Sequence, residues 1–388
     1  MGAKQNDLLI YPVIILFVPL LVLNLIPIGE QQFVALSQSI LQGKLNVTSD
    51  SSSFADYASY KGYYYWPLGP FPAIALLPFV AIMGTNFYQG LLQLPLSIIN
   101  FFLVYNICLV LQLESKKSFW AAVFFIFGSV YTPVAAISFS WYLAQIVATT
   151  LLLSALYSFL VNKSWLLTGI LMGLAVATRS SLVLGAFFFL FYIFRNKDTA
   201  KNLLLFAAPI AVGVVLLAMY NFVRFDTILE SGYNYQNIPE IVRATRDYGL
   251  FSPKHIPANL YYMLLKTPDP IFLENSHVLQ FPYIKYDPFG ISVFVLSPIL
   301  FLLAKTRLKE KYVAPAIATS VLIAIPIITY CGIGYIQVGY RYALDFFPFL
   351  LIPLASAIRY SNMKVVIALT SLGILSTWFL LIGRIAGI

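Results

Sequence analysis

The chain has 388 residues, of which 60% are hydrophobic and only 10% are charged. A soluble domain is usually about half apolar and about a quarter charged, so this composition excludes an ordinary soluble enzyme, a disordered protein and a disulfide scaffold. It predicts an all-α polytopic membrane protein that forms a single domain over residues 1–388. The net charge of +9 does not indicate a nucleic-acid partner, because the basic residues fall in short loops between apolar stretches.

Long uncharged stretches mark the expected membrane spans. The first, 8–29, runs 22 residues and is interpreted as a retained span, because no small-x-small cleavage site of a signal peptide follows it. The 52 uncharged residues between Lys61 and Glu114 predict one span, and the 45 between Lys117 and Lys163 predict two spans with a turn near 138–141. Five more spans are expected at 202–223, 288–304, 312–340, 342–358 and 365–383.

Two segments decide the number of crossings. Residues 164–178 and 180–194 flank Arg179, and each would reach only about 22 Å as a helix, which is short of the roughly 30 Å hydrocarbon core. We predict a helical hairpin with Arg179 at its external turn. The apolar segment 66–84 contains four prolines, which interrupt helices, so we expect it to lie in the outer interface. The prediction is about eleven spans.

The distribution of charge predicts the orientation. Thirteen basic residues fall in short segments, which are expected on the cytoplasmic side together with the N-terminus. Two long loops, 30–87 and 224–287, then face outward and hold ten of the fifteen acidic residues.

A charged side chain inside a span costs about 2.5–3.5 kcal/mol on insertion scales, so one that is present usually faces a cavity or a partner. The acidic candidates are Glu30, where the first span ends, and Asp56 in the first long loop. Glu30 is interpreted either as a catalytic carboxylate or as a charge at the end of an amphipathic helix over 31–41. Asp56 is interpreted either as a second carboxylate of the same site or as a solvated loop acid.

The basic candidates suggest an anion site. Arg341 and Asp345 are four residues apart, which predicts either an internal pair on one helix face or an anion site whose arginine is fixed by the aspartate. Arg179 and Arg224 are interpreted as interfacial side chains or, with Lys61 and Arg341, as a phosphate or pyrophosphate site. The two histidines lack the spacing of metal ligands.

Several strings in a fixed order resemble the GT-C superfamily of integral-membrane glycosyltransferases, in its protein-mannosyltransferase-like and aminoarabinose-transferase-like branch. They are Gly29-Glu30, ALSQSILQGKL (35–45), GYYYWPLGP (62–70), SWYLAQ (140–145), GLAVATR (173–179), YNFVRF (220–225), SGY (231–233) and GYRYALDF (339–346).

The resemblance implies a GT-C-like fold in a membrane, such as the plasma membrane of a prokaryote. It also implies transfer of a sugar from a polyprenyl-phosphate donor to a lipid, glycan or protein acceptor on the non-cytoplasmic face. By motif position, Glu30 is the residue that acts as base or positions the acceptor, although family members more often have Asp there, and Asp56 is a second acid. The donor phosphate would face Arg179 and Arg341. The motifs add as supporting residues Tyr64, Trp66, Gln145, Asn221, Tyr340 and Asp345.

The chemistry of such a reaction agrees with these residue types. A single displacement at an anomeric carbon needs a carboxylate to accept the acceptor's proton and cations to hold the departing phosphate. Some superfamily members use a divalent metal and others do not, so a metal cofactor stays open. Two other functions compete with the enzyme: a transporter or flippase of lipid-linked sugars, which would use the same basic groove, and a structural subunit that only binds a partner.

Overall fold

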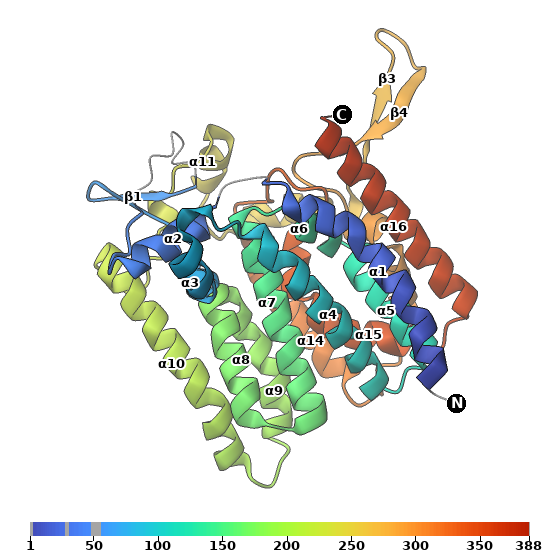
Figure 1. Cartoon of the computed structure of the whole chain (residues 1–388), viewed down its shortest axis with the longest axis horizontal. Helices are drawn as coiled ribbons and strands as arrows, with labels where there is room; N and C mark the ends of the chain where they lie inside the picture. Colours follow the sequence, from blue (N-terminus) through green and yellow to red (C-terminus); the bar gives the residue numbers. More distant parts are fainter. Residues whose placement is uncertain (1–2, 28–30, 48–55, 388) are drawn as a thin grey trace.

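The computed structural model describes residues 3–27, 31–47 and 56–387. These residues form a helical bundle with two small β-hairpins (Figure 1). The elements up to the middle of the chain are α1 (Ala3–Leu25), α2 (Gln32–Leu41), β1 (Ala58–Tyr60), β2 (Tyr63–Tyr65), α3 (Phe71–Met83), α4 (Gly90–Val110), α5 (Ser115–Phe127), α6 (Tyr131–Ala136), α7 (Ser140–Tyr157), α8 (Trp165–Thr178) and α9 (Ala186–Ile193).

The second half of the chain contains α10 (Thr199–Phe225), α11 (Glu240–Arg246), α12 (Ile256–Leu260), β3 (Asp269–Phe272), β4 (Leu279–Lys285), α13 (Val293–Leu296), α14 (Val313–Thr329), α15 (Phe347–Arg359) and α16 (Met363–Ala386). Three short 3₁₀ helices also matter below: η3 (Ser180–Gly185), η7 (Pro298–Lys305) and η8 (Arg341–Asp345).

Among the described residues, four helices are long and apolar enough to cross a membrane. They are Gly90–Val110, Ser140–Asn162, Thr199–Phe225 and Met363–Ala386. The shortest has 21 residues, which at 1.5 Å per residue gives about 31 Å, the thickness of a hydrocarbon core. The sequence prediction of a helical membrane protein agrees with this finding.

The chain reverses direction at Arg179, as the sequence predicted. The Phe159 ring lies 5.4 Å from that of Trp165, at the beginning of α8, and 5.3 Å from that of Tyr192, near the end of α9. The two ends of the hairpin therefore meet, and Arg179 lies between α8 and η3 at the opposite end.

Three of the predicted spans are less regular than expected. Residues 288–304 contain only the short α13 followed by η7, and the helix predicted over 312–340 ends at Thr329. The span predicted over 342–358 begins with η8 and becomes α-helical only at Phe347. Proline at 298, 326 and 348 and glycine at 332 and 334 explain these breaks, because proline removes a backbone donor and glycine weakens a helix.

The segments predicted to be loops gather at one end of the bundle, here called the loop end, where α2, β1 and α11 lie near the C-terminal end of α10 (Figure 1). The helix α2 packs on α3, and the Ser37 hydroxyl donates a hydrogen bond of 2.7 Å to the Ala73 carbonyl. Since α3 has only 13 residues, it reaches about 20 Å. The interfacial position of 66–84 stays a prediction.

Candidate functional site

Three arginines from separate parts of the chain converge at the loop end. Arg179 follows α8, Arg246 ends α11 and Arg341 begins η8. All three lie near the Tyr233 hydroxyl. Burial raises the pKa of Tyr233 to about 12, and the positive charges of Arg179, Arg341 and Arg246 oppose that rise. The sequence predicted that Arg179 and Arg341 belong to one site, but it did not single out Arg246.

Arg179 is fixed by a buried carboxylate. Its Nη2 and Nε atoms donate hydrogen bonds of 2.8 Å and 3.1 Å to Oδ2 of Asp345, whose side chain is only 1% exposed. This pairing corrects the prediction that Asp345 pairs with or fixes Arg341. In a 3₁₀ helix the residues three apart lie above one another, so Arg341 and Asp345, four apart in η8, do not share a face as they would in an α-helix.

Arg341 is buried without a carboxylate partner among the described residues. Its side-chain hydrogen bonds are long, at 3.4 Å, from Nη1 to Oε1 of Gln145 and from Nη2 to the Tyr342 hydroxyl, and in the described part of the chain its Nε has no hydrogen-bond partner. The residue is 7% exposed. Gln145 also donates a 3.0 Å hydrogen bond to the Arg341 carbonyl, which fixes the backbone at this point.

Arg179 and Arg341 face the same tyrosine ring. The Cζ atoms of the two arginines lie 5.9 Å and 4.6 Å from the centre of the Tyr342 ring. The two guanidinium carbons are therefore no further apart than the sum of these distances, 10.5 Å. Arginine presents several N–H donors in a planar fork that suits phosphate oxygens, so one phosphate group placed between the two could be reached from both sides.

Asp56 is a second described carboxyl group next to this cluster. It is half-buried just before β1, and its side chain and carbonyl accept hydrogen bonds of 3.5 Å and 3.1 Å from Gln236. Burial raises the pKa of Asp56, while the positive charges of Arg341 and Arg246 lower it. A carboxyl group with a raised pKa is a suitable proton acceptor for an alcohol.

Arg246 connects Asp56 to the second long loop. Its Nη2 donates a 3.1 Å hydrogen bond to Oε1 of Gln236, the residue that bonds Asp56, and its Nη1 donates to the Tyr233 carbonyl. No described carboxylate lies within ion-pair distance of Arg246 or Arg341. The cluster thus holds three arginines against two carboxyl groups among the described residues, and one of those carboxyls has a raised pKa.

Two of the predicted phosphate-binding residues have partners elsewhere. The Lys61 ammonium pairs with Asp226 at 2.6 Å, and both side chains are more than half exposed. Arg224 donates hydrogen bonds of 2.8 Å to the Trp66 carbonyl and to Oδ1 of Asn221. These contacts hold the first loop on α10, so Arg224, Asn221 and Trp66 form a structural junction.

The remaining predicted residues lie as follows. Glu30 falls outside the described residues. Tyr64 pairs with Ser59 across the β1–β2 hairpin, and its carbonyl accepts a hydrogen bond of 2.8 Å from the Val47 amide. Tyr340 is buried beside Arg341, and its hydroxyl donates a hydrogen bond of 2.7 Å to Oδ1 of Asn259.

A glycine brings the first loop into direct contact with the end of α8. A Cβ atom on Gly69 would lie 2.7 Å from the Thr178 carbonyl oxygen and closer still to that of Ala177. Ala177 and Thr178 are the two residues before Arg179. The backbone of the proline-rich segment at Gly69 therefore packs directly against the end of α8 that carries Arg179. Only a residue without a side chain fits here.

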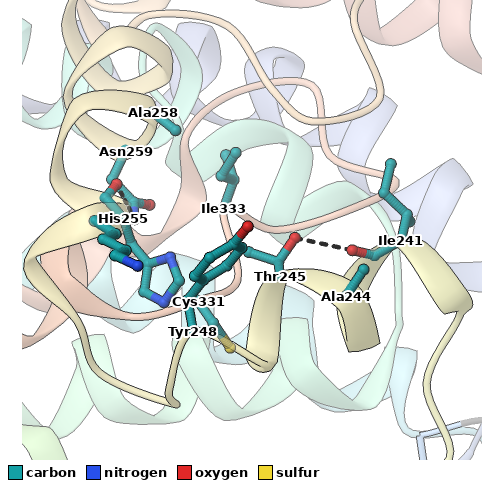
Figure 2. A pocket seen from close by; sticks show the side chains of 10 residues that line it. Ile241, Ala244, Thr245, Tyr248, His255, Ala258, Asn259, Cys331 and Ile333 are labelled. Atoms are coloured by element: carbon teal, nitrogen blue, oxygen red, sulfur yellow. Dashed lines mark hydrogen bonds between the residues drawn. The ribbon is translucent and has the colours of Figure 1, made fainter.

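A cavity of about 570 Å³ opens beside the cluster. Figure 2 shows its lining side chains, which come from α11, α12, the 248–255 segment between these helices and the 331–333 segment. Two of them connect it to the site: Asn259 accepts the hydrogen bond of Tyr340, and Cys331 lies close enough to Arg246 to feel its charge. The described residues include no group of three His, Cys, Asp or Glu side chains that could hold a metal ion.

The chain matches no protein-family profile, no curated protein and no solved structure.

Proposed function

We propose that this chain is a membrane glycosyltransferase that moves a sugar from a polyprenyl-phosphate donor to an acceptor at the non-cytoplasmic face. One observation carries the proposal: Arg341 is buried with no carboxylate partner among the described residues, beside an arginine that has one. An ion moved out of water needs an opposite charge close by. A phosphate group bound between Arg179 and Arg341 supplies that charge.

The reaction we propose is a single inverting displacement. The acceptor oxygen attacks the anomeric carbon, and the bond from that carbon to the phosphate oxygen breaks, leaving the electron pair on the phosphate. A carboxylate takes the acceptor proton, and Asp56 is the described residue suited to this step because it lies next to Arg341 and Arg246 and has a raised pKa. Glu30 remains the other proposed base, from its motif position. Arg341 stabilises the charge that develops on the departing phosphate.

We also propose a GT-C-like arrangement with about eleven crossing segments, including the short hairpin helices α8 and α9, and with the loop end outside. The support is the placement of the basic residues in short loops. Labelling of single cysteines placed at Lys116 and Glu310 should occur from the cytoplasm, and labelling of those at Asp50 and Leu260 from outside. Finding the cysteines at 50 and 116 on the same side would contradict this topology.

The activity can be tested with purified protein in lipid vesicles. We expect release of free polyprenyl phosphate from at least one member of a panel of polyprenyl-phosphate sugars, and loss of that release in Arg341→Lys. The matched control is Arg307→Lys. The Arg307 guanidinium lies 3.6 Å from the centre of the Tyr360 ring, and Arg307 is far from the cluster residues in the sequence. Movement of intact donors across the membrane without release would favour the transporter instead.

A further inference from the structure

The hairpin of β3 and β4 exposes an unusual amount of apolar surface. It projects from the body of the protein beside the C-terminal end of α16 (Figure 1). Phe281 is 76% exposed and Tyr283 is 52% exposed. Further exposed apolar side chains in the same hairpin are Phe272, Leu273, Val278, Leu279 and Ile284. Apolar surface gathered in this way usually marks a contact with another protein or with a membrane.

The exposed aromatic side chains lie close together on the ribbon. Phe272 pairs directly with Leu279 across the two strands. A register shift between Pro270 and Phe272 interrupts the regular alternation of the ribbon, and the rings of Phe281 and Tyr283 lie 5.9 Å apart. The exposed cluster formed by Phe272, Leu279, Phe281 and Tyr283 is called the aromatic face below.

The base of the hairpin is anchored by a partly buried charge cluster. The Lys266 ammonium contacts Asp269 at 2.5 Å and Asp287 at 3.2 Å, and its side chain is only 12% exposed. Because Asp269 begins β3 and Asp287 follows β4, both strands are tied to one point. An isolated two-stranded hairpin is marginally stable in water, so this anchor fixes where the aromatic face lies.

The strands are poorly suited to adding a strand from another protein. Pro270 lies in β3 and Pro282 in β4, and a proline lacks the backbone N–H that strand addition uses. A partner would therefore have to bind the side chains of the ribbon and not its edges.

The apolar surface of the hairpin continues that of a membrane-spanning helix. The strand β4 contacts α16, which is one of the four helices of spanning length in the described chain. Near its C-terminal end α16 exposes Phe379, Ile382 and Ile385. A hairpin beside the end of a span lies at the level of the lipid headgroups, where aromatic side chains are enriched.

We propose that the aromatic face of the β3–β4 hairpin binds the headgroup interface of the bilayer beside α16. This inference rests on the membrane location of the chain and does not depend on glycosyl transfer. The hairpin would thereby fix the second long loop relative to the membrane surface, and with it the cavity and Arg246.

The test uses single cysteines labelled with an environment-sensitive fluorophore on the full chain in phosphatidylcholine vesicles. The position on the aromatic face is Phe281→Cys, and the matched control is Gln280→Cys, the exposed polar neighbour outside that cluster. The native Cys108 and Cys331 are buried, and the unmutated chain measures their background labelling. Lipid carrying a nitroxide near the headgroup and aqueous iodide serve as the two quenchers.

We expect the fluorophore at 281 to lose emission to the lipid nitroxide and to be protected from iodide, relative to the fluorophore at 280. Two results would overturn the proposal. If iodide quenches both positions alike and the lipid nitroxide quenches neither, the aromatic face is in water. If position 281 is protected from both quenchers, a protein surface, such as a second copy of the chain, covers it.

Discussion

Removing Asp345 alone should destabilise the protein much more than removing Asp345 and Arg179 together. One oxygen of Asp345 accepts hydrogen bonds of 2.8 Å and 3.1 Å from Arg179, and the two side chains are only 1% and 13% exposed. In Asp345→Ala the guanidinium stays buried without its counter-charge. Breaking a buried pair in this way costs about 3–5 kcal/mol, whereas replacing both partners by apolar residues of similar volume is often neutral.

Thermal unfolding in lipid nanodiscs measures this difference. Asp345→Ala should unfold at a clearly lower temperature than the parent chain, and Arg179→Met combined with Asp345→Leu should recover most of the loss. Binding of a polyprenyl-phosphate sugar provides the second measurement, and it should stay weak in the recovered double variant because one of the two phosphate ligands is gone. The reasoning fails if the double variant is as unstable as Asp345→Ala, or if it binds donor as tightly as the parent chain.

Three other predictions concern the cluster and its support. Arg341→Lys keeps the charge but loses the planar fork, so donor titration should show weaker binding with an unchanged melting temperature. Gly69→Ala places a Cβ against the end of α8 and should lower both the melting temperature and turnover. Because burial raises the pKa of Asp56 and only the ionised form accepts a proton, turnover should rise with pH through that raised pKa. Asp56→Asn should remove this rise and lower turnover by about 10²–10⁴-fold. If Asp56→Asn leaves turnover unchanged and Glu30→Gln abolishes it, the base is Glu30.

The sequence predicted that Arg179 and Arg341 lie together, but it did not predict their partners. A charge inside an apolar stretch is conspicuous, so Arg179 and Arg341 could be identified from composition alone. Their pairing could not, because the spacing of Arg341 and Asp345 indicates a shared face only if the segment is an α-helix. The helix ends before residues 330–340, and Arg341 begins a 3₁₀ helix, so Arg341 and Asp345 do not share a face. The chain reversal at Arg179 places that arginine beside Asp345 instead.

Arg246 was missed for the opposite reason. It lies in a polar part of the second long loop, among Glu240, Arg243 and Asp247. In such a segment one further charged residue does not indicate a functional site. Its role emerges only because the loop folds back on the first one: the amide of Asp56 donates to the Asn237 carbonyl at 2.8 Å, and the amide of Asn237 donates to the Tyr57 carbonyl at the same distance. Such contacts between distant loops have no local pattern in the sequence.

In the proposed reaction, the charge arrangement of the cluster favours the leaving phosphate over the bound donor. Asp345 neutralises Arg179 and fixes it, so Arg341 and Arg246 remain as cations opposite one carboxyl, Asp56, whose pKa is raised. A sugar phosphodiester carries one negative charge, whereas a phosphate monoester carries about −1.5 to −2 at neutral pH. The attraction to fixed guanidinium groups therefore grows as the bond to the sugar breaks. Interactions that strengthen toward the transition state accelerate a reaction, whereas equal binding of substrate and transition state does not. A transporter does not break the bond to the sugar, so it would gain nothing from stronger attraction to the monoester.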